Sequence, residues 1–320
     1  MDAAYDDTAL FAWVTDALGG AVQSAEEIQT LWSGYGHILR LRLSGAAVER
    51  VIVKHVRPPS VMKHPRGWAG QTSHERKLRS YAVERAFYLH REPVDGHRTA
   101  RCFAAEASDD GFRLLLEDLD AAGFPARRQQ PSEHEMAACL RWLASFHAHH
   151  LGARPEGLWP VGTYWHLDTR RDELAAMDDD ELRAAAAPLD AALQACPFRT
   201  LVHGDAKVAN FCFGSDGVAA VDFQYVGGGC GVQDVAYLLS SCLDDDACEL
   251  HAERHLDTYF AALRARVADD VDGPALELAW RGLYPAAWAD FHRFLVGWAP
   301  DHWKIHRYTR RMTREALARL

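Results

Sequence analysis

One short stretch of the sequence places carboxylate and amide side chains where they could transfer a phosphoryl group. Asp205 lies between His203 and Asn210, and Asp222 follows twelve residues after the asparagine. Phosphoryl transfer brings several negative charges together, so Mg²⁺ has to be held there by hard oxygen ligands. Asn210 and Asp222 can supply these oxygens, which leaves Asp205 to accept the proton of an incoming hydroxyl.

These residues follow the order of the kinase signature, H-x-D-x-x-x-x-N and then D-F-x. The alternative interpretation makes Asp205 and Asp222 turn residues and His203 a core histidine. Two motifs in the right order and at the right spacing favour the kinase site. The β-type segments at 200–203 and 218–223 are predicted to form a small hairpin that leaves both carboxylates in loops.

A lysine and a glutamate further upstream are predicted to form an ion pair. Lys54 is flanked by apolar residues in a predicted strand, where an ammonium is awkward unless it meets a phosphate and a carboxylate. The alternative is an edge-strand lysine that faces water. The next predicted helix, 73–90, offers two glutamates. Glu75 would be engaged in a capping box with Thr72, so Glu84 is the predicted partner of Lys54.

Two further features near the predicted site have competing interpretations. Gly34 and Gly36 precede the first predicted strand, and their backbone N–H groups could cover phosphates. Leu39 replaces the third glycine of G-x-G-x-x-G, so a plain turn is the alternative. Lys207 lies two residues after Asp205, where its ammonium could neutralise the transferring phosphate. The alternative there is a solvated loop lysine.

The pattern of the remaining chain predicts a β-rich first third and a mainly helical remainder. Ser132 and Glu135 indicate a capped helix start. Near Glu117–Gly123 the composition shifts, which marks the predicted boundary between lobes. The elements expected from periodicity and turn residues are a helix at 6–18, a hairpin of strands at 38–43 and 50–56, the helix at 73–90, a strand at 112–116, and helices again from about 232.

The sequence resembles the aminoglycoside phosphotransferase and choline kinase superfamily, and within it most closely the ecdysteroid-kinase-like group. The resemblance runs from about residue 32 to 243, and the segment after it matches only in helical character. The matching residues are His203-Gly-Asp205…Asn210, Asp222-Phe-Gln224, Asp234-Val-Ala-Tyr237-Leu238, Glu84-x-x-Phe87-Tyr88 and Leu116-Glu-Asp-Leu119.

The resemblance implies an α+β, bilobal protein-kinase-like fold with ATP and Mg²⁺ bound between the lobes. The small β-rich N-lobe would be 1–118 and the larger, mainly helical C-lobe 119–320. The backbone at the hinge, including Glu117 and Leu119, would hydrogen-bond adenine, and the predicted lysine–glutamate pair would place the α- and β-phosphates. Asp234 would brace the catalytic loop.

The predicted function is therefore ATP- and Mg²⁺-dependent transfer of the γ-phosphate to a hydroxyl of a small molecule. A protein kinase is disfavoured because only eleven residues separate Asp222 from Asp234 and no A-P-E follows. Gly204 also replaces the arginine that protein kinases use to clamp a phosphorylated activation loop. A catalytically silent, nucleotide-binding pseudokinase is disfavoured because no catalytic position has been replaced.

Composition excludes several other classes. The 320 residues are 48% hydrophobic and 25% charged, which is typical of a folded domain, and 35 basic against 45 acidic residues give −10. A net anion is a poor generic partner for nucleic acid or an anionic membrane. No apolar run approaches the ~18 residues of a membrane helix, and the N-terminus does not read as a secretory signal. Seven scattered cysteines without C-x-x-C predict reduced thiols in a cytoplasmic protein.

The acceptor, the choice between ATP and GTP, and the oligomeric state stay open. Net acidity favours a cationic acceptor such as an amine or an aminoglycoside, whereas the aromatic C-terminal segment favours an apolar or sterol-like alcohol; a sugar is also open. Aromatic rings at helical spacing predict a core stripe on both sides of Pro285, where a second helix is expected to start. A minority of the rings could line an acceptor pocket.

Other clusters are predicted to be structural. His147, His149 and His150 lie close together but lack the i, i+4 spacing of a metal site, so they are predicted to be core or surface residues. The basic segment 304–319 is predicted to be a charged helix exterior.

Overall fold

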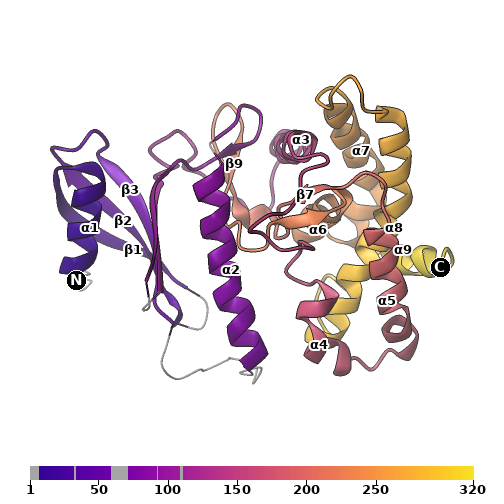
Figure 1. The fold of residues 1–320 in the computed structure, drawn as a ribbon. Helices are drawn as coiled ribbons and strands as arrows, with labels where there is room; N and C mark the ends of the chain where they lie inside the picture. The colour runs from indigo at the N-terminus through magenta and orange to yellow at the C-terminus, as the bar shows by residue number, and fades with distance from the viewer. Residues whose placement is uncertain (1–6, 32–33, 59–70, 92, 109–110) are drawn as a thin grey trace. The chain divides into compact units, whose positions relative to one another are not determined.

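The structure is a computed structural model that describes residues 7–31, 34–58, 71–91, 93–108 and 111–320 (Figure 1). It contains two compact units. The first comprises Met1–Val94 and Thr99–Ala126, and the second comprises Asp95–Arg98 and Arg127–Leu320. The sequence-based boundary at 118/119 falls inside the second segment of the first unit.

The first unit is an antiparallel sheet in the order β1-β2-β3-β6-β5. Its elements are α1 (Thr8–Leu18), β1 (Ala21–Thr30), β2 (Gly36–Ser44), β3 (Arg50–Val56), α2 (Gln71–His90), β5 (Cys102–Ser108) and β6 (Gly111–Glu117). The short β4 (Arg98–Thr99) falls where the chain changes unit. The predicted hairpin and the strand at 112–116 are thus present as β2, β3 and β6.

Apolar residues on alternate strand positions build the core of this unit. Leu10 and Val14 of α1 pack against Leu39, Leu41 and other buried residues of the sheet, while α2 contacts β5 and β6. Figure 1 shows the two helices on opposite faces of the sheet. Period-two alternation puts these apolar residues on one face of the sheet, the face that α1 covers.

One prediction for this unit is wrong. The polar, mostly exposed strand β1 was not expected, so the turn with Gly34 and Gly36 joins β1 to β2 instead of preceding the first strand. α2 begins at Gln71, and the predicted capping box involves the side chain of Thr72, which lies outside what the structure describes. Glu75 is exposed one turn into α2.

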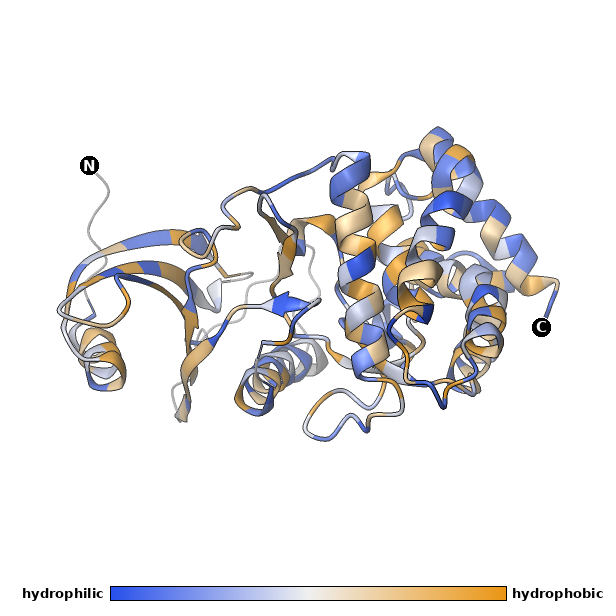
Figure 2. Ribbon diagram, turned by 90° about the horizontal axis from the view of Figure 1, so that it is seen from above, coloured by the Kyte–Doolittle hydropathy of each residue, from blue (hydrophilic) through white to orange (hydrophobic). Residues whose placement is uncertain are grey.

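The second unit is mainly helical. Its helices are α3 (Glu133–His149), α4 (Arg171–Ala175), α5 (Asp180–Gln194), α6 (Val232–Cys242), α7 (Asp245–Arg264), α8 (Gly273–Trp298) and α9 (Arg307–Leu317), with short 3₁₀ turns at Leu167–Thr169 and Val208–Asn210. Figure 2 shows hydrophobic and hydrophilic residues on the same helices, as expected when one face of each helix lies in the core. The predicted capping box of Ser132 and Glu135 opens α3.

Four short strands of this unit flank the predicted catalytic residues. They are β7 (Thr200–Val202), β8 (Phe211–Phe213), β9 (Val218–Ala220) and β10 (Gly227–Gly229). The predicted pairing of 200–203 with 218–223 is wrong, because β7 pairs with β10 and β9 pairs with β8. Only four residues join β8 to β9, so this pairing costs less loop-closure entropy than the predicted pairing of 200–203 with 218–223.

The predicted helix start at Pro285 is also wrong, because α8 continues through this proline. Proline removes one helical hydrogen bond. Trp280, Tyr284 and Trp288 on either side of it are buried, so packing holds the helix together. The core stripe of aromatic residues is therefore confirmed.

Within the described ranges, no helix combines the length and the apolar character needed to cross a membrane. The seven cysteines, all of them described, are free thiols.

Candidate phosphotransfer site

A buried aspartate fixes the loop that carries the predicted catalytic base. Asp234 on α6 is fully buried, and its two carboxylate oxygens accept the backbone N–H groups of His203 at 2.6 Å and Gly204 at 2.9 Å. The His147 Nε2 lies 3.0 Å from the same carboxylate. Asp234 therefore makes the bracing contact that the resemblance implies, and His147 is a core histidine, as predicted.

Gly204 is required by the shape of this loop. Its φ is +78°, a left-handed value that favours glycine. A Cβ at this position would clash with the carbonyl oxygen of Tyr225. This close approach gives a physical reason why arginine is not accommodated here.

Asp205 has one anchored carboxylate oxygen and one without a partner. The residue is 6% exposed. Its Oδ2 accepts from Lys207 Nζ at 2.8 Å and from Asn210 Nδ2 at 3.0 Å. Its buried Oδ1 has no hydrogen-bond partner in the described part of the chain, although the Tyr237 phenol is near enough to interact with this carboxylate. An unsatisfied buried acceptor is unfavourable, so Oδ1 is suited to receive a hydroxyl.

Lys207 and Asn210 orient this carboxylate. Burial disfavours the Lys207 ammonium, but attraction to Asp205 and Asp222 outweighs burial and raises the pKa of Lys207. Asn210 donates its amide to the Asp205 carbonyl oxygen at 2.8 Å as well as to the side chain. Its own Oδ1 is thereby left as a possible metal ligand. Lys207 is a loop residue whose side chain is 37% exposed, so its role at the transferring phosphate stays a prediction.

Asp222 is held in an unusual conformation. It has φ of +69°, and within the described residues only Thr163 is another non-glycine residue with positive φ. Such strain persists only where the surroundings enforce it. Gln224 Nε2 donates to Asp222 Oδ1 at 2.6 Å, and the Phe223 ring packs 4.6 Å from that of His203. Asn210 and Asp222 together offer the hard oxygen donors that Mg²⁺ prefers, so these residues fit the ion.

The first unit pairs the predicted lysine and glutamate. Lys54 Nζ lies 2.7 Å from Glu84 Oε2, and both side chains are buried. β3 is a central strand, with Lys54 opposite Ile38 on one side and Leu114 on the other. The edge-strand alternative is therefore wrong. Binding of phosphate by this pair stays a prediction.

The backbone groups predicted to contact the nucleotide are partly engaged. The Gly34 amide donates to the Leu31 carbonyl at 3.0 Å, which fits the plain-turn interpretation, while Ser33 of the same motif lies outside the described residues. The Glu117 amide donates to the Arg101 carbonyl at 2.9 Å, and the Leu119 carbonyl accepts from Phe124 at 2.8 Å.

Gly36 has a clear structural role in the same turn. Its φ is +131°, and a Cβ would clash with the carbonyl oxygen of His55 on the neighbouring strand.

Two residues near Asp205 could not be foreseen from the sequence. Lys304, predicted to be on a helix exterior, is buried just before α9 and interacts electrostatically with Asp205. That prediction is wrong for Lys304. Tyr164 adds a phenol 3.4 Å from that of Tyr237. Both residues are distant in sequence from the catalytic motif, so no local pattern indicates that they lie near Asp205.

Comparison with known proteins finds similar sequences and folds. The model of the ecdysteroid kinase-like family matches residues 166–269, about a third of the chain, and this segment includes Asp205, Asn210 and Asp222. A choline kinase from Cryptosporidium parvum Iowa II superposes with a TM-score of 0.55 at 11% identity, over 98% of this chain and 95% of that one.

The chain has the protein-kinase-like fold of the choline kinases and aminoglycoside phosphotransferases.

Two further structures with this fold contain ligands. An amicoumacin kinase in complex with AMP-PNP, Ca²⁺ and Ami gives a TM-score of 0.51 at 14% identity, over 98% of this chain and 92% of that one. An aminoglycoside phosphotransferase in a ternary complex with ADP and hygromycin B gives 0.50 at 14%, over 92% and 100%. No curated protein sequence matches the chain. The predicted α+β fold class, with a β-rich and a helical part, is confirmed.

Proposed function

We propose that the protein transfers the γ-phosphate of ATP to a hydroxyl of a small molecule with the help of Mg²⁺. The observation that carries the proposal is the Asp205 carboxylate, with Oδ2 anchored by Lys207 and Asn210 and Oδ1 buried without a partner. The structures with AMP-PNP and Ca²⁺ or with ADP support a nucleotide and a metal ion as cofactors.

In this mechanism Asp205 Oδ1 accepts the hydrogen bond, and then the proton, of the acceptor hydroxyl. The hydroxyl oxygen attacks the γ-phosphorus while the bond to the ADP oxygen breaks. Lys207 offsets negative charge on the transferring phosphate. Bound Mg²⁺, held by Asn210 and Asp222, would neutralise the phosphates.

The first unit would supply the remaining nucleotide contacts. Lys54, oriented by Glu84, would bind the α- and β-phosphates. The turn with Gly34 and Gly36 would lie over the phosphates, and the backbone at Glu117 and Leu119 would contact adenine. Because the Glu117 amide already has a partner, the Leu119 amide is the proposed donor.

The segment after Asp222 argues against a protein substrate. Residues 226–235 are buried, and Gly227–Gly229 pair with β7, so this short segment offers no exposed platform for a peptide. The acceptor is therefore proposed to be a small hydroxylated molecule. Location in the cytoplasm stays a prediction.

The test is ADP release from ATP and Mg²⁺ with a panel of small alcohols. Asp205→Asn should keep ATP binding, measured by calorimetry, and lose about 10²–10⁴-fold in kcat, whereas the exposed Asp216→Asn should behave as the unaltered protein. Equal turnover of Asp205→Asn and the unaltered protein would remove Asp205 from the mechanism. Tight binding of ATP with Mg²⁺ without turnover of any acceptor would favour the pseudokinase.

A further inference from the structure

Lys304, a lysine outside the kinase motifs, places its ammonium over three aromatic rings. Lys304 Nζ is 4.9 Å from the ring centre of Tyr237, 5.3 Å from that of Phe291 and 5.7 Å from that of Trp303. The residue is 9% exposed. Within the described residues, this ammonium has neither a hydrogen bond nor a salt bridge. A nearly buried cation without a direct ion-pair partner is unfavourable, and cation–π contacts compensate only partly.

This unpaired ammonium lies beside the proposed reacting groups. Burial lowers the pKa of Lys304 to about 8, against the attraction of Asp205, while Lys207 lowers it further. Since this value is above 7, most of the lysine is still charged at neutral pH. The Tyr237 ring under the ammonium also carries the phenol that interacts with Asp205. Lys304 is therefore close enough to Asp205 for its charge to act on an acceptor bound at that carboxylate.

We infer that Lys304 is an acceptor-recognition residue that selects hydroxylated acceptors with an anionic group and disfavours cationic ones. This inference rests on the proposed function, because it assigns the acceptor of the same site. An aromatic cage is the usual binding place of a quaternary ammonium, but here the chain's own ammonium occupies it. A cationic acceptor would be repelled by Lys304 and Lys207, whereas a carboxylate or phosphate would give Lys304 the direct ion-pair partner that it lacks among the described residues.

The stability of Lys304→Met separates recognition from a structural role. The folded-state pKa, about 8, is below the ~10.4 of a free lysine, so at pH 7 burial of the charged form destabilises the fold. Methionine keeps the apolar stem and removes this charge, so the Tm should rise. A lysine that only stabilises the fold would give a lower Tm. Arg310→Met, on the exposed surface of α9, is the matched control and should change neither the Tm nor the rate of ADP release.

The functional arm measures ADP release with choline, glycerol and glycerate, which share a primary hydroxyl and differ in charge. Only glycerate should stimulate the unaltered protein, and Lys304→Met should lose this stimulation at least tenfold while the KM for ATP is unchanged. Lys304→Arg should restore part of it. Stimulation by choline, or a Tm of Lys304→Met below that of the unaltered protein, would overturn the inference. Failure of the proposed function would instead abolish ADP release with all three alcohols and leave the rise in Tm.

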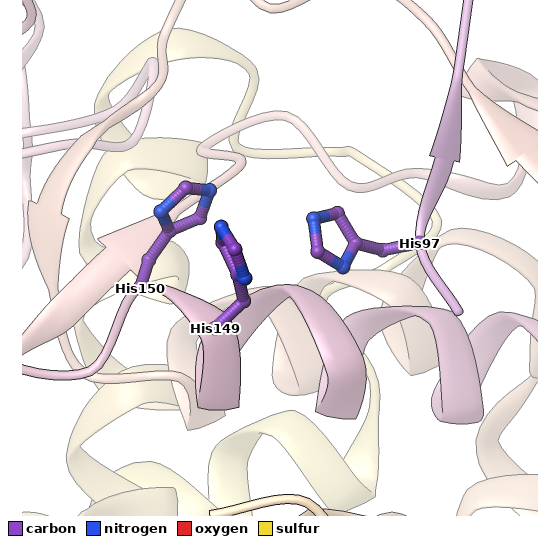
Figure 3. A group of neighbouring side chains, drawn as sticks. All are labelled: His97, His149 and His150. Atoms are coloured by element: carbon purple, nitrogen blue, oxygen red, sulfur yellow. The ribbon is translucent and has the colours of Figure 1, made fainter. Parts of the chain in front are cut away.

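A second inference rests on a separate cluster of three histidines in the second unit. His149 is the last residue of α3, His150 follows it, and His97 comes from the segment before β4. One ligand nitrogen of each ring lies within 4.8 Å of those of the other two. Figure 3 shows the His149 ring between the other two. The spacing of His147, His149 and His150 does not indicate a metal site, because the third ligand, His97, lies about fifty residues away in the sequence.

The surroundings suit a divalent cation. His97 is buried, and its Nδ1 lies 3.1 Å from Ser145 Oγ, which leaves Nε2 as the ligand atom. The C-terminal end of α3 also carries the negative end of its helix dipole, which favours cations.

The geometry points to a binding site for Zn²⁺ or a similar transition metal ion, formed by His97, His149 and His150. Three imidazole ligands leave the fourth tetrahedral position for water. Rotation of the three side chains would bring their ligand nitrogens close enough together to bind a single ion.

Titration of the tag-free full chain with Zn²⁺ and Co²⁺, followed by calorimetry and visible absorption, tests this site. One equivalent should bind, with a tetrahedral Co²⁺ spectrum that lacks thiolate charge transfer. His149→Ala should weaken binding at least about tenfold, and this exposed position should leave the fold intact. His134→Ala, exposed at the other end of the same helix, is the control. Absence of binding, a thiolate band, or equal affinity of His149→Ala and the control would overturn the inference.

Discussion

Replacement of Asp234 with alanine should destabilise the protein by releasing the catalytic loop. The carboxylate accepts the backbone N–H groups of His203 and Gly204, and it is fully buried. Each buried donor left without a partner costs about 1–3 kcal/mol, so the two together cost about 2–6 kcal/mol. This is a large part of the ~5–15 kcal/mol that stabilises a typical domain. Asp234→Asn keeps one acceptor oxygen, so its free energy of unfolding should lie between those of the unaltered protein and Asp234→Ala.

A matched control separates this effect from the general loss of an aspartate. Asp272 is exposed and caps α8 by accepting a single backbone N–H, that of Ala275, at 2.9 Å. Loss of such a cap costs about 1 kcal/mol. Urea denaturation of the unaltered protein, Asp234→Ala and Asp272→Ala gives the three free energies of unfolding. If Asp234→Ala costs no more than Asp272→Ala, the bracing role is refuted.

Three further predictions test the rest of the site. Asp222→Ala removes a proposed metal ligand, so the half-saturating Mg²⁺ concentration in ADP release should rise, and an unchanged titration would contradict that role. Lys54→Met should raise the KM for ATP and lower kcat, and Glu84→Gln should do so more mildly. The double variant should be no worse than Lys54→Met, because both residues act through one contact. Additive losses would contradict the pairing. Gly204→Ala should lower the Tm because its positive φ and close backbone contact leave no room for a Cβ, whereas Gly282→Ala, in an open position within α8, should raise it slightly; equal shifts would contradict the argument.

The residues of the catalytic loop could be predicted because their spacing reflects local geometry. Asp205 and Asn210 lie within one loop and one 3₁₀ turn, so the N–H···O contacts between them depend on few intervening residues. The Lys54–Glu84 pair lies thirty residues apart, yet its two members occur at apolar positions of a strand and a helix. A charge at such a position requires a partner, and this requirement identifies the pair.

Burial separates the two glutamates of α2 that could pair with Lys54 more clearly than helix capping does. Glu75 is unsuitable because it is exposed, whereas Glu84 is 2% exposed and reaches Lys54. Burial therefore decides the choice.

Elements without a local signal could not be predicted. β1 is mostly polar and exposed, so it lacks the alternation that identifies a half-buried strand, and it forms because β2 offers an edge. Pro285 would end an isolated helix, but the packing of α8 against α5, α6 and α9 outweighs this tendency. In both cases tertiary contacts outweigh the preference of the segment itself.

The same reasoning explains why net charge is a poor guide to the acceptor. The net charge of −10 suggested a cationic acceptor, yet much of the acidic surplus lies at the surface, where Glu249 pairs with Arg311 and the exposed Asp246 with Arg307. Exposed pairs of this kind contribute little to a distant site, because water and salt screen them. The positive charges that act on Asp205 are those of Lys207, whose side chain is 37% exposed, and of the buried Lys304. The charge of the acceptor should therefore follow such nearby groups and not the net charge of the chain.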